Sequence, residues 1–100
     1  MINIYFLPAR PPDARFPFGQ LVITRNAAEH LDKRDVIVAL DRHGKGDWGD
    51  LTPEDRKEND LALKSGGRLL SAYHDHKDVK FWVITEADRI ATTVLLPEDY

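Results

Sequence analysis

The sequence contains no cysteine, which excludes disulfides, thiol catalysis and every zinc site built on Cys ligands. No apolar run approaches the roughly 20 residues that a membrane-spanning helix needs. Residues 1–7 lack the basic region and the cleavage site of a secretory signal. A full set of metal ligands and a phosphate-binding glycine loop are missing too, so no metal and no cofactor is expected. These absences favour a cytoplasmic protein without a membrane partner, and 100 residues predict a single domain over residues 1–100.

Strong positive charge is also missing. The 14 Lys and Arg residues are outnumbered by 17 Asp and Glu residues, and they form no basic stripe. A domain that grips DNA usually carries a basic face, because contacts to phosphates supply most of its affinity. Acidic residues gather instead in one stretch of the chain, as Asp47, Asp50, Glu54, Asp55, Glu58 and Asp60. Such a set could present negative charge to a protein partner, in particular a basic, nucleic-acid-binding one.

The order of patterns along the chain predicts an α+β fold. The apolar run of residues 2–7 predicts an N-terminal strand. Four prolines within residues 8–17 exclude helix and central strand there, so this segment should cross the surface as a Pro-rich arm. The aromatic residues Phe16 and Phe18 should fix the arm to the body. Residues 19–24 predict a second short strand.

Two or three helices are expected next. Thr24 or Asn26 can cap a short helix that ends at Leu31. Asp32 can cap a second helix over residues 33–42. That second helix has a competing interpretation as a strand, because three β-branched residues follow one another within it.

A third helix carries the clearest start signal. Thr52 is a suitable N-cap, and Pro53 occupies the first helical position, where proline is favoured. The helix should run to Ser65 and end at Gly66 and Gly67. Its few apolar residues predict a surface helix that is held by one edge.

Three runs rich in β-branched and aromatic residues follow, at residues 68–74, 80–85 and 90–96. Short polar loops separate them, which is typical of a three-stranded antiparallel meander. We expect this sheet to pack one face against the helices. The core is expected to include seven apolar residues, namely Leu21, Ile23, Leu40, Leu70, Phe81, Val83 and Val94.

Arg42 ends the second predicted helix, and His43 follows it, just before a glycine-rich turn. A His just past a helix end can act as a general acid or base, or it can interact with the helix end as a C-cap. The turn itself contains Asp47 and Trp48. We expect Trp48 to be buried as an anchor, since packing of a large ring offsets the freedom of the flanking glycines. Arg42, Asp47 and Trp48 are therefore candidate binding residues.

A second polar cluster lies beside the last strands. Glu86, Asp88 and Arg89 occupy a tight turn, and Thr92 and Thr93 point to opposite faces of the following strand. The cluster is either part of a functional site or an ordinary turn, in which the acids accept backbone N–H bonds and Arg89 pairs with Asp88. Glu86 and Asp88 are candidate binding residues in the first case.

Longer segments carry a family resemblance that runs from Phe18 to the end of the chain. They include Arg42-His43, Gly46-Asp47-Trp48-Gly49, Arg68-Leu69-Leu70-Ser71-Ala72-Tyr73, the segment from Trp82 to Arg89, and the segment from Thr92 to Pro97. These segments resemble small, largely uncharacterised bacterial proteins of plasmids and other mobile elements, often labelled plasmid-related protein or type I restriction enzyme M subunit. A methyltransferase subunit needs a doubly wound sheet and a much longer chain. The resemblance therefore implies a non-enzymatic accessory or interaction protein of a mobile genetic element, linked to defence or restriction systems.

The layout is also similar, more loosely, to the barnase/EndoU/RelE-like nucleases. An early strand, helices that carry His residues and a terminal antiparallel sheet follow one another in the same order. This likeness implies, as the alternative, a metal-independent, toxin-like ribonuclease that acts on RNA. In that case the base would be His43 or His30, the phosphate clamp Arg89 or Arg42, and the orienting hydroxyl Thr92 or Thr93.

Overall fold

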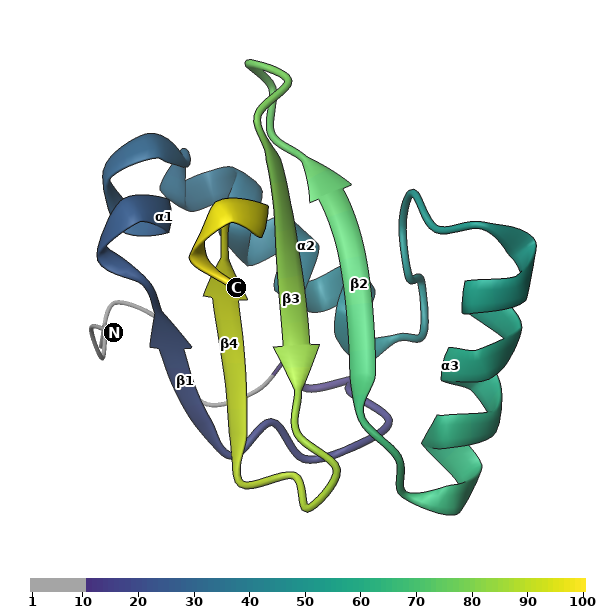
Figure 1. Cartoon of the computed structure of the whole chain (residues 1–100). Helices are drawn as coiled ribbons and strands as arrows, with labels where there is room; N and C mark the ends of the chain where they lie inside the picture. The colour runs from purple at the N-terminus through teal and green to yellow at the C-terminus, as the bar shows by residue number, and fades with distance from the viewer. Residues whose placement is uncertain (1–10) are drawn as a thin grey trace.

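The computed structural model describes residues 11–100, which form an α+β fold as expected (Figure 1). The strand expected at residues 2–7 and the first part of the arm, residues 8–10, lie outside the described residues. Within residues 11–100 the elements are β1 (Gln20–Ile23), α1 (Arg25–His30), α2 (Lys33–Gly44), α3 (Pro53–Ser65), β2 (Leu69–His74), β3 (Lys80–Thr85), β4 (Ala91–Leu95) and the 3-10 turn η1 (Pro97–Asp99). None of the described helices is long and apolar enough to cross a membrane.

The strands form one mixed sheet in the order β1-β4-β3-β2. The antiparallel pairing of β2 with β3 and of β3 with β4 confirms the expected meander. The expectation that the sheet stops at three strands is wrong, because β1 adds to it parallel to β4, with Val22 beside Thr93. Parallel neighbours need a long crossover, and the whole segment from α1 to β3 supplies it.

The helices begin at the caps that the sequence indicates. The hydroxyls of Thr24 and Thr52 and the carboxylate of Asp32 each accept a hydrogen bond from a backbone N–H in the first helical turn. The competing strand interpretation within α2 is wrong. Helical spacing there buries one stripe and leaves Ile37 and Val38 exposed, at 43% and 58%.

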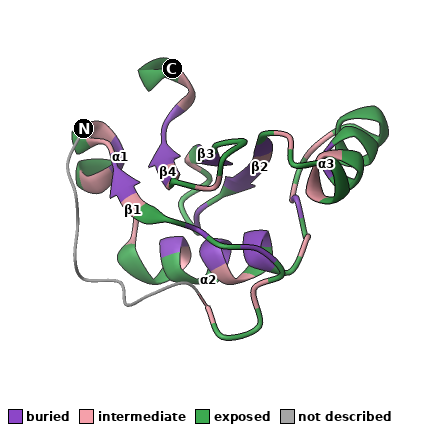
Figure 2. Cartoon of the chain, turned by 90° about the horizontal axis from the view of Figure 1, so that it is seen from below, coloured by how far each residue is buried: buried purple, intermediate pink, exposed green. Residues whose placement is uncertain are grey.

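One face of the sheet packs against α2, and the C-terminal segment lies over the other face (Figure 2). Phe16 and Phe18 are 4% and 1% exposed, so the arm is attached to the core as expected. Trp48 is also buried, which confirms its expected role as an anchor. Five of the seven residues expected in the core are buried as well: Ile23, Leu40, Phe81, Val83 and Val94.

Leu21 and Leu70 are only partly buried, so the expectation for these two residues is wrong. Leu21 lies on β1, which ends the strand order and has a pairing partner on one side only among the described strands. Side chains alternate along a strand, and in β2 it is Leu69 and Tyr73 that join the core against α2. Leu70 consequently points to the opposite, more open face.

Candidate functional site

A buried chain of polar side chains crosses the core beneath the sheet. Nδ1 of His43 lies 2.6 Å from the hydroxyl of Ser71, and its Nε2 lies 2.9 Å from the hydroxyl of Thr85. Thr85 in turn lies 2.8 Å from Thr92, whose hydroxyl donates to the carbonyl oxygen of Phe18 at 2.7 Å. The four side chains are 0% exposed. This series of hydrogen-bonded side chains therefore connects α2, three strands and the arm, and it has no contact with solvent.

The hydrogen bonds of this chain run in one direction. A carbonyl oxygen can only accept, so the single hydroxyl proton of Thr92 is committed to Phe18. Thr85 must then donate to Thr92, which leaves Thr85 as the acceptor for Nε2–H of His43. In the neutral ring Nδ1 then carries no proton and accepts from Ser71. The geometry thus assigns a neutral His43 to the Nε2–H tautomer.

His43 occupies a different environment from the one expected. It lies in the last turn of α2 rather than past its end. The rings of Phe16, Trp48 and Phe18 surround it at centroid distances of 5.3, 5.6 and 5.8 Å. This burial, together with the positive charge of Arg89, lowers the pKa of His43 from 6.5 to about 3. The residue is a neutral core histidine near neutral pH.

Arg89 is held by backbone carbonyl groups. Its Nη1 donates to Gly67, just past the end of α3, at 2.7 Å and to Glu86 at 3.0 Å. In the ordinary-turn alternative, the backbone N–H bond to an acid is present, from Ile90 to the Asp88 carboxylate, but the pairing of Arg89 with Asp88 is wrong. Arg89 thus links the β3–β4 turn to the end of α3, while the side chains of Glu86 and Asp88 stay exposed.

The residues assigned to a ribonuclease do not meet at a point that RNA could reach. His43 and Thr92 are wholly buried, and the guanidinium of Arg89 is bound to carbonyl oxygens. Thr93 points to the opposite face of the sheet, beside Ile84. His30 lies on α1, separate from this group, with Nδ1 bonded to the carbonyl of its own helix at 2.8 Å. The structure therefore does not bring these residues together on one surface, as the ribonuclease alternative would require.

The candidate binding residues before α3, Arg42, Asp47 and Trp48, contact other residues of the protein itself. Arg42 and Asp47 form an ion pair at 2.7 Å, and the guanidinium of Arg42 lies 4.7 Å from the centre of the Tyr73 ring. The ion pair lowers the pKa of Asp47. Trp48 donates from its indole nitrogen to Asp60 of α3 at 2.9 Å. These contacts fix the glycine-rich turn against β2 and α3.

Asp32 and Asp35 at the start of α2 lie close to His76 in the β2–β3 hairpin. Their possible metal-ligand atoms are all within 4.8 Å of one another. Asp35 accepts hydrogen bonds from both the ring and the backbone nitrogen of His76, at 2.6 and 3.0 Å. This hydrogen bonding lowers the pKa of Asp35 and raises the pKa of His76. Asp32 meanwhile caps α2. We interpret the group as a clamp between the β2–β3 hairpin and α2.

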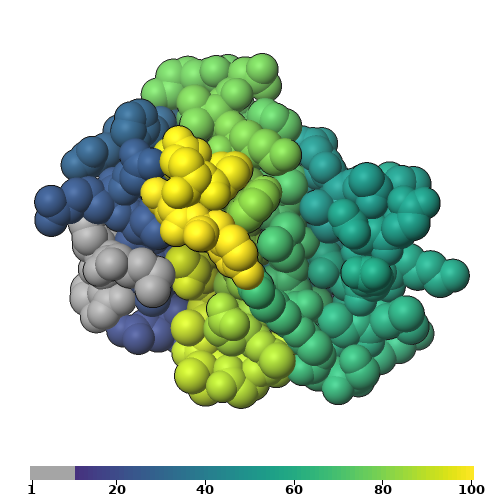
Figure 3. Space-filling view, in the orientation of Figure 1, coloured from purple at the N-terminus to yellow at the C-terminus, as the bar shows by residue number. Residues whose placement is uncertain are grey.

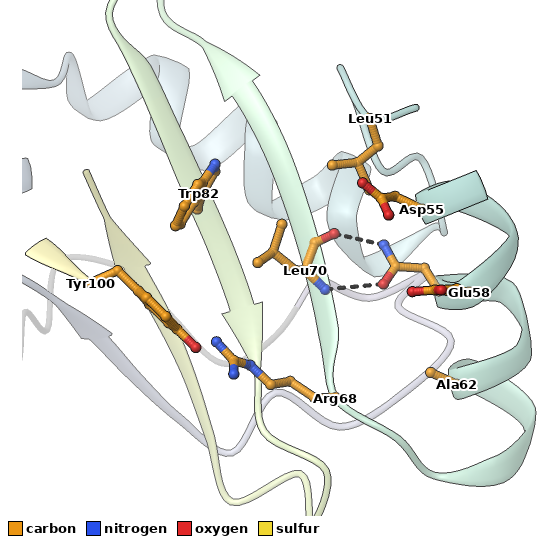
Figure 4. A pocket seen from close by; sticks show the side chains of 9 residues that line it. Leu51, Asp55, Glu58, Ala62, Arg68, Leu70, Trp82 and Tyr100 are labelled. Carbon is orange, nitrogen blue, oxygen red and sulfur yellow. Dashed lines mark hydrogen bonds between the residues drawn. The ribbon is translucent and has the colours of Figure 1, made fainter. Parts of the chain in front are cut away.

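An open groove lies on the face of the sheet away from α2 (Figure 4). Leu70 and the partly exposed Trp82 form its floor. Helix α3 makes one wall, and Arg68 and Tyr100 approach each other on the opposite side. The groove has a volume of about 490 Å³. Its lining residues are Leu51, Asp55, Glu58, Asn59, Ala62, Arg68, Leu70, Trp82 and Tyr100.

Helix α3 forms this wall because Asn59 attaches it to the edge of β2. The amide nitrogen of Asn59 donates to the Leu70 carbonyl at 2.6 Å, and its oxygen accepts from the Leu70 N–H at 3.2 Å. The side chain therefore pairs with β2 as a neighbouring strand would. In the space-filling view, α3 (teal) and the C-terminal segment (yellow) flank the green atoms of the sheet between them (Figure 3).

The acidic set divides into two groups in three dimensions. Asp47, Asp50 and Asp60 are engaged, with Arg42, with His74 at 2.8 Å and with Trp48 respectively. The carboxylates of Glu54, Asp55 and Glu58 have no hydrogen bond or ion pair with another described residue. Of these three, Asp55 and Glu58 line the groove.

Reasoning from the sequence singled out Asp55 and Glu58 as part of the acidic set, but it missed Asn59, Arg68 and Tyr100. The available signal was Asn59, an uncharged polar residue within a strongly charged helix. The chain matches no known family model, no curated protein and no solved structure. The resemblance to plasmid proteins therefore stays a prediction, and the groove is the best-defined candidate site.

Proposed function

We propose that this chain is a protein-interaction module that binds a basic segment of a partner protein in the groove beside α3. The observation that carries the proposal is the position of two carboxylates, Asp55 and Glu58, next to an apolar floor and without a partner among residues 11–100. The proposal retains the non-enzymatic, accessory role expected from the sequence and assigns it a surface.

The chemistry of the groove suits a short peptide segment. Its volume of about 490 Å³ lies within the usual range of ligand sites, which is roughly 300–1,000 Å³. Trp82 and Leu70 offer apolar area that a partner side chain would bury, and the large Trp ring is of the type that dominates binding energy at interfaces. The groove is thus able to supply both an apolar anchor and a charge contact.

Charge complementarity favours a protein partner over a nucleic acid. Carboxylates in the wall repel phosphate groups and attract Lys or Arg side chains. A basic, nucleic-acid-binding protein presents such side chains, so it remains the partner class that we propose. The link to a mobile genetic element, to restriction or defence, and to the cytoplasm is part of the proposal and rests on the sequence resemblance and on composition.

Selection of displayed random peptides on the immobilised full chain tests this function. The selected peptides should be enriched in Lys or Arg next to an apolar residue. Synthetic versions should bind the Glu58→Lys variant at least about fivefold more weakly than the wild type, because an attraction becomes a repulsion.

Glu29→Lys is the matched control for this experiment. Glu29 lies on α1, its carboxylate has no partner among the described residues, and it does not line the groove. This variant should bind the peptides as the wild type does. Equal binding by Glu58→Lys and wild type, or no enrichment over an empty support, would show that the groove is not the docking site.

A further inference from the structure

The two walls of the groove carry opposite charges. Asp55 and Glu58 project from α3 on one side, and Arg68 projects from the start of β2 toward the other side (Figure 4). No ion pair joins Arg68 to a carboxylate among the described residues. The apolar floor of Leu70 and Trp82 lies between the two walls.

Arg68 lies against an aromatic ring at the groove. Its guanidinium carbon lies 5.0 Å from the centre of the Tyr100 ring, and the centres of the Tyr100 and Trp82 rings are 5.8 Å apart in a T-shaped arrangement. A cation over an aromatic face keeps its outer N–H groups available for a carboxylate. Arg68 is therefore able to form a bidentate ion pair beside the groove.

The C-terminal segment that carries Tyr100 is itself anchored. Asp99 accepts hydrogen bonds from Thr24 at 2.6 Å and from Asn26 at 3.1 Å, and these contacts lower the pKa of Asp99. The wall made by Tyr100 and Arg68 is thus tied to the start of α1, near the edge of the sheet opposite to α3 (Figure 1). A tethered wall of this kind favours one geometry of a bound segment.

We infer that the groove binds its partner segment in a single orientation, with a basic residue toward α3, an apolar residue on Trp82 and an acidic residue toward Arg68. This inference rests on the proposed function and adds a requirement for an acidic group to it. The same segment bound in the reverse direction would meet like charges at both walls, which disfavours that direction.

Three synthetic peptides that differ only in charge test this inference: Gly-Lys-Leu-Glu-Gly, Gly-Lys-Leu-Gln-Gly and Gly-Gln-Leu-Glu-Gly, each with blocked ends. Binding is followed by NMR through the indole N–H of Trp82. The indole of Trp48 is buried and bonded to Asp60, so it serves as an internal reference. The wild type should bind the peptide with both charges at least about threefold more tightly than either of the others.

Variants of Arg68 and Glu58 test the contribution of each wall separately. Arg68→Gln should abolish the preference for Glu over Gln in the peptide, whereas Arg68→Lys should retain it. Arg56→Gln removes the same charge from a residue that does not line the groove, and it should leave the preference unchanged. Glu58→Gln should weaken only the preference for Lys, because Asp55 remains in the same wall.

The outcomes distinguish a failure of this inference from a failure of the proposed function on which it rests. If Lys is preferred and Glu58→Gln weakens that preference, but Arg68→Gln changes nothing, the groove binds basic segments without the proposed orientation. If Trp82 responds to none of the peptides, both the orientation and the basic-segment function are wrong.

Discussion

Replacement of Thr85 by Val isolates the buried polar chain, because it keeps the shape of the side chain and removes the central hydroxyl. The change leaves Nε2–H of His43 without an acceptor and Thr92 without a donor, in a region where the side chains are 0% exposed. A buried polar group that loses its partner costs about 1–3 kcal/mol. Since two groups are affected, we expect the free energy of unfolding to fall by about 2–4 kcal/mol.

The assay is urea unfolding at pH 7.5, followed by tryptophan fluorescence. Thr93→Val is the matched control, because Thr93 lies on the opposite face of the sheet and its hydroxyl forms no hydrogen bond with a described residue. We expect that control to stay within about 0.5 kcal/mol of the wild type. If Thr85→Val and Thr93→Val have the same stability and the same dependence on urea, the closed chain of hydrogen bonds does not contribute to stability.

Three further measurements examine the core and the groove wall. Folding lowers the pKa of His43 from 6.5 to about 3. Below pH 6.5 the unfolded chain therefore binds more protons at this residue than the folded chain does. We expect the free energy of unfolding to fall by about 2 kcal/mol between pH 8 and pH 5. This urea unfolding series uses the His76→Gln variant, because the raised pKa of His76 has the opposite effect: its stabilisation is lost as the pH rises. A free energy of unfolding that does not change between pH 8 and pH 5 would contradict the burial of a neutral His43. Nitrogen NMR of the His43 ring should show the proton on Nε2, and a proton on Nδ1 would reverse the assigned direction of the hydrogen bonds. Asn59→Ala should cost about 1–3 kcal/mol and speed amide exchange at Leu70, and unchanged exchange would mean that Asn59 does not protect this edge of the sheet.

Local features of this fold follow from the sequence because their causes lie within a few residues. Thr52 and Pro53 form a helix start through contacts inside a single turn, and Asp32 does the same for α2. The meander was predictable as well, since short polar loops force neighbouring strands to pair antiparallel. In α2, however, a local signal was ambiguous, and packing of one helical stripe against the sheet decided it.

The position of β1 was decided by contacts between distant residues. Its pairing with β4 joins residues that are about seventy positions apart, and no local pattern selects that partner. The same applies to His43. From the sequence it was a candidate base at a helix end, and only the arrival of Ser71, Thr85 and three aromatic rings from other segments makes it a neutral core residue.

The groove also depends on tertiary structure alone. Asn59 pairs with Leu70 and so sets α3 beside the sheet, which brings Glu58 opposite Arg68 across an apolar floor. Composition revealed that this chain carries excess acid near its third helix. Which of those carboxylates have no partner in the described part of the chain was decided by the folded structure, because the contacts of Asp50 with His74 and of Asp60 with Trp48 form only when separate segments meet.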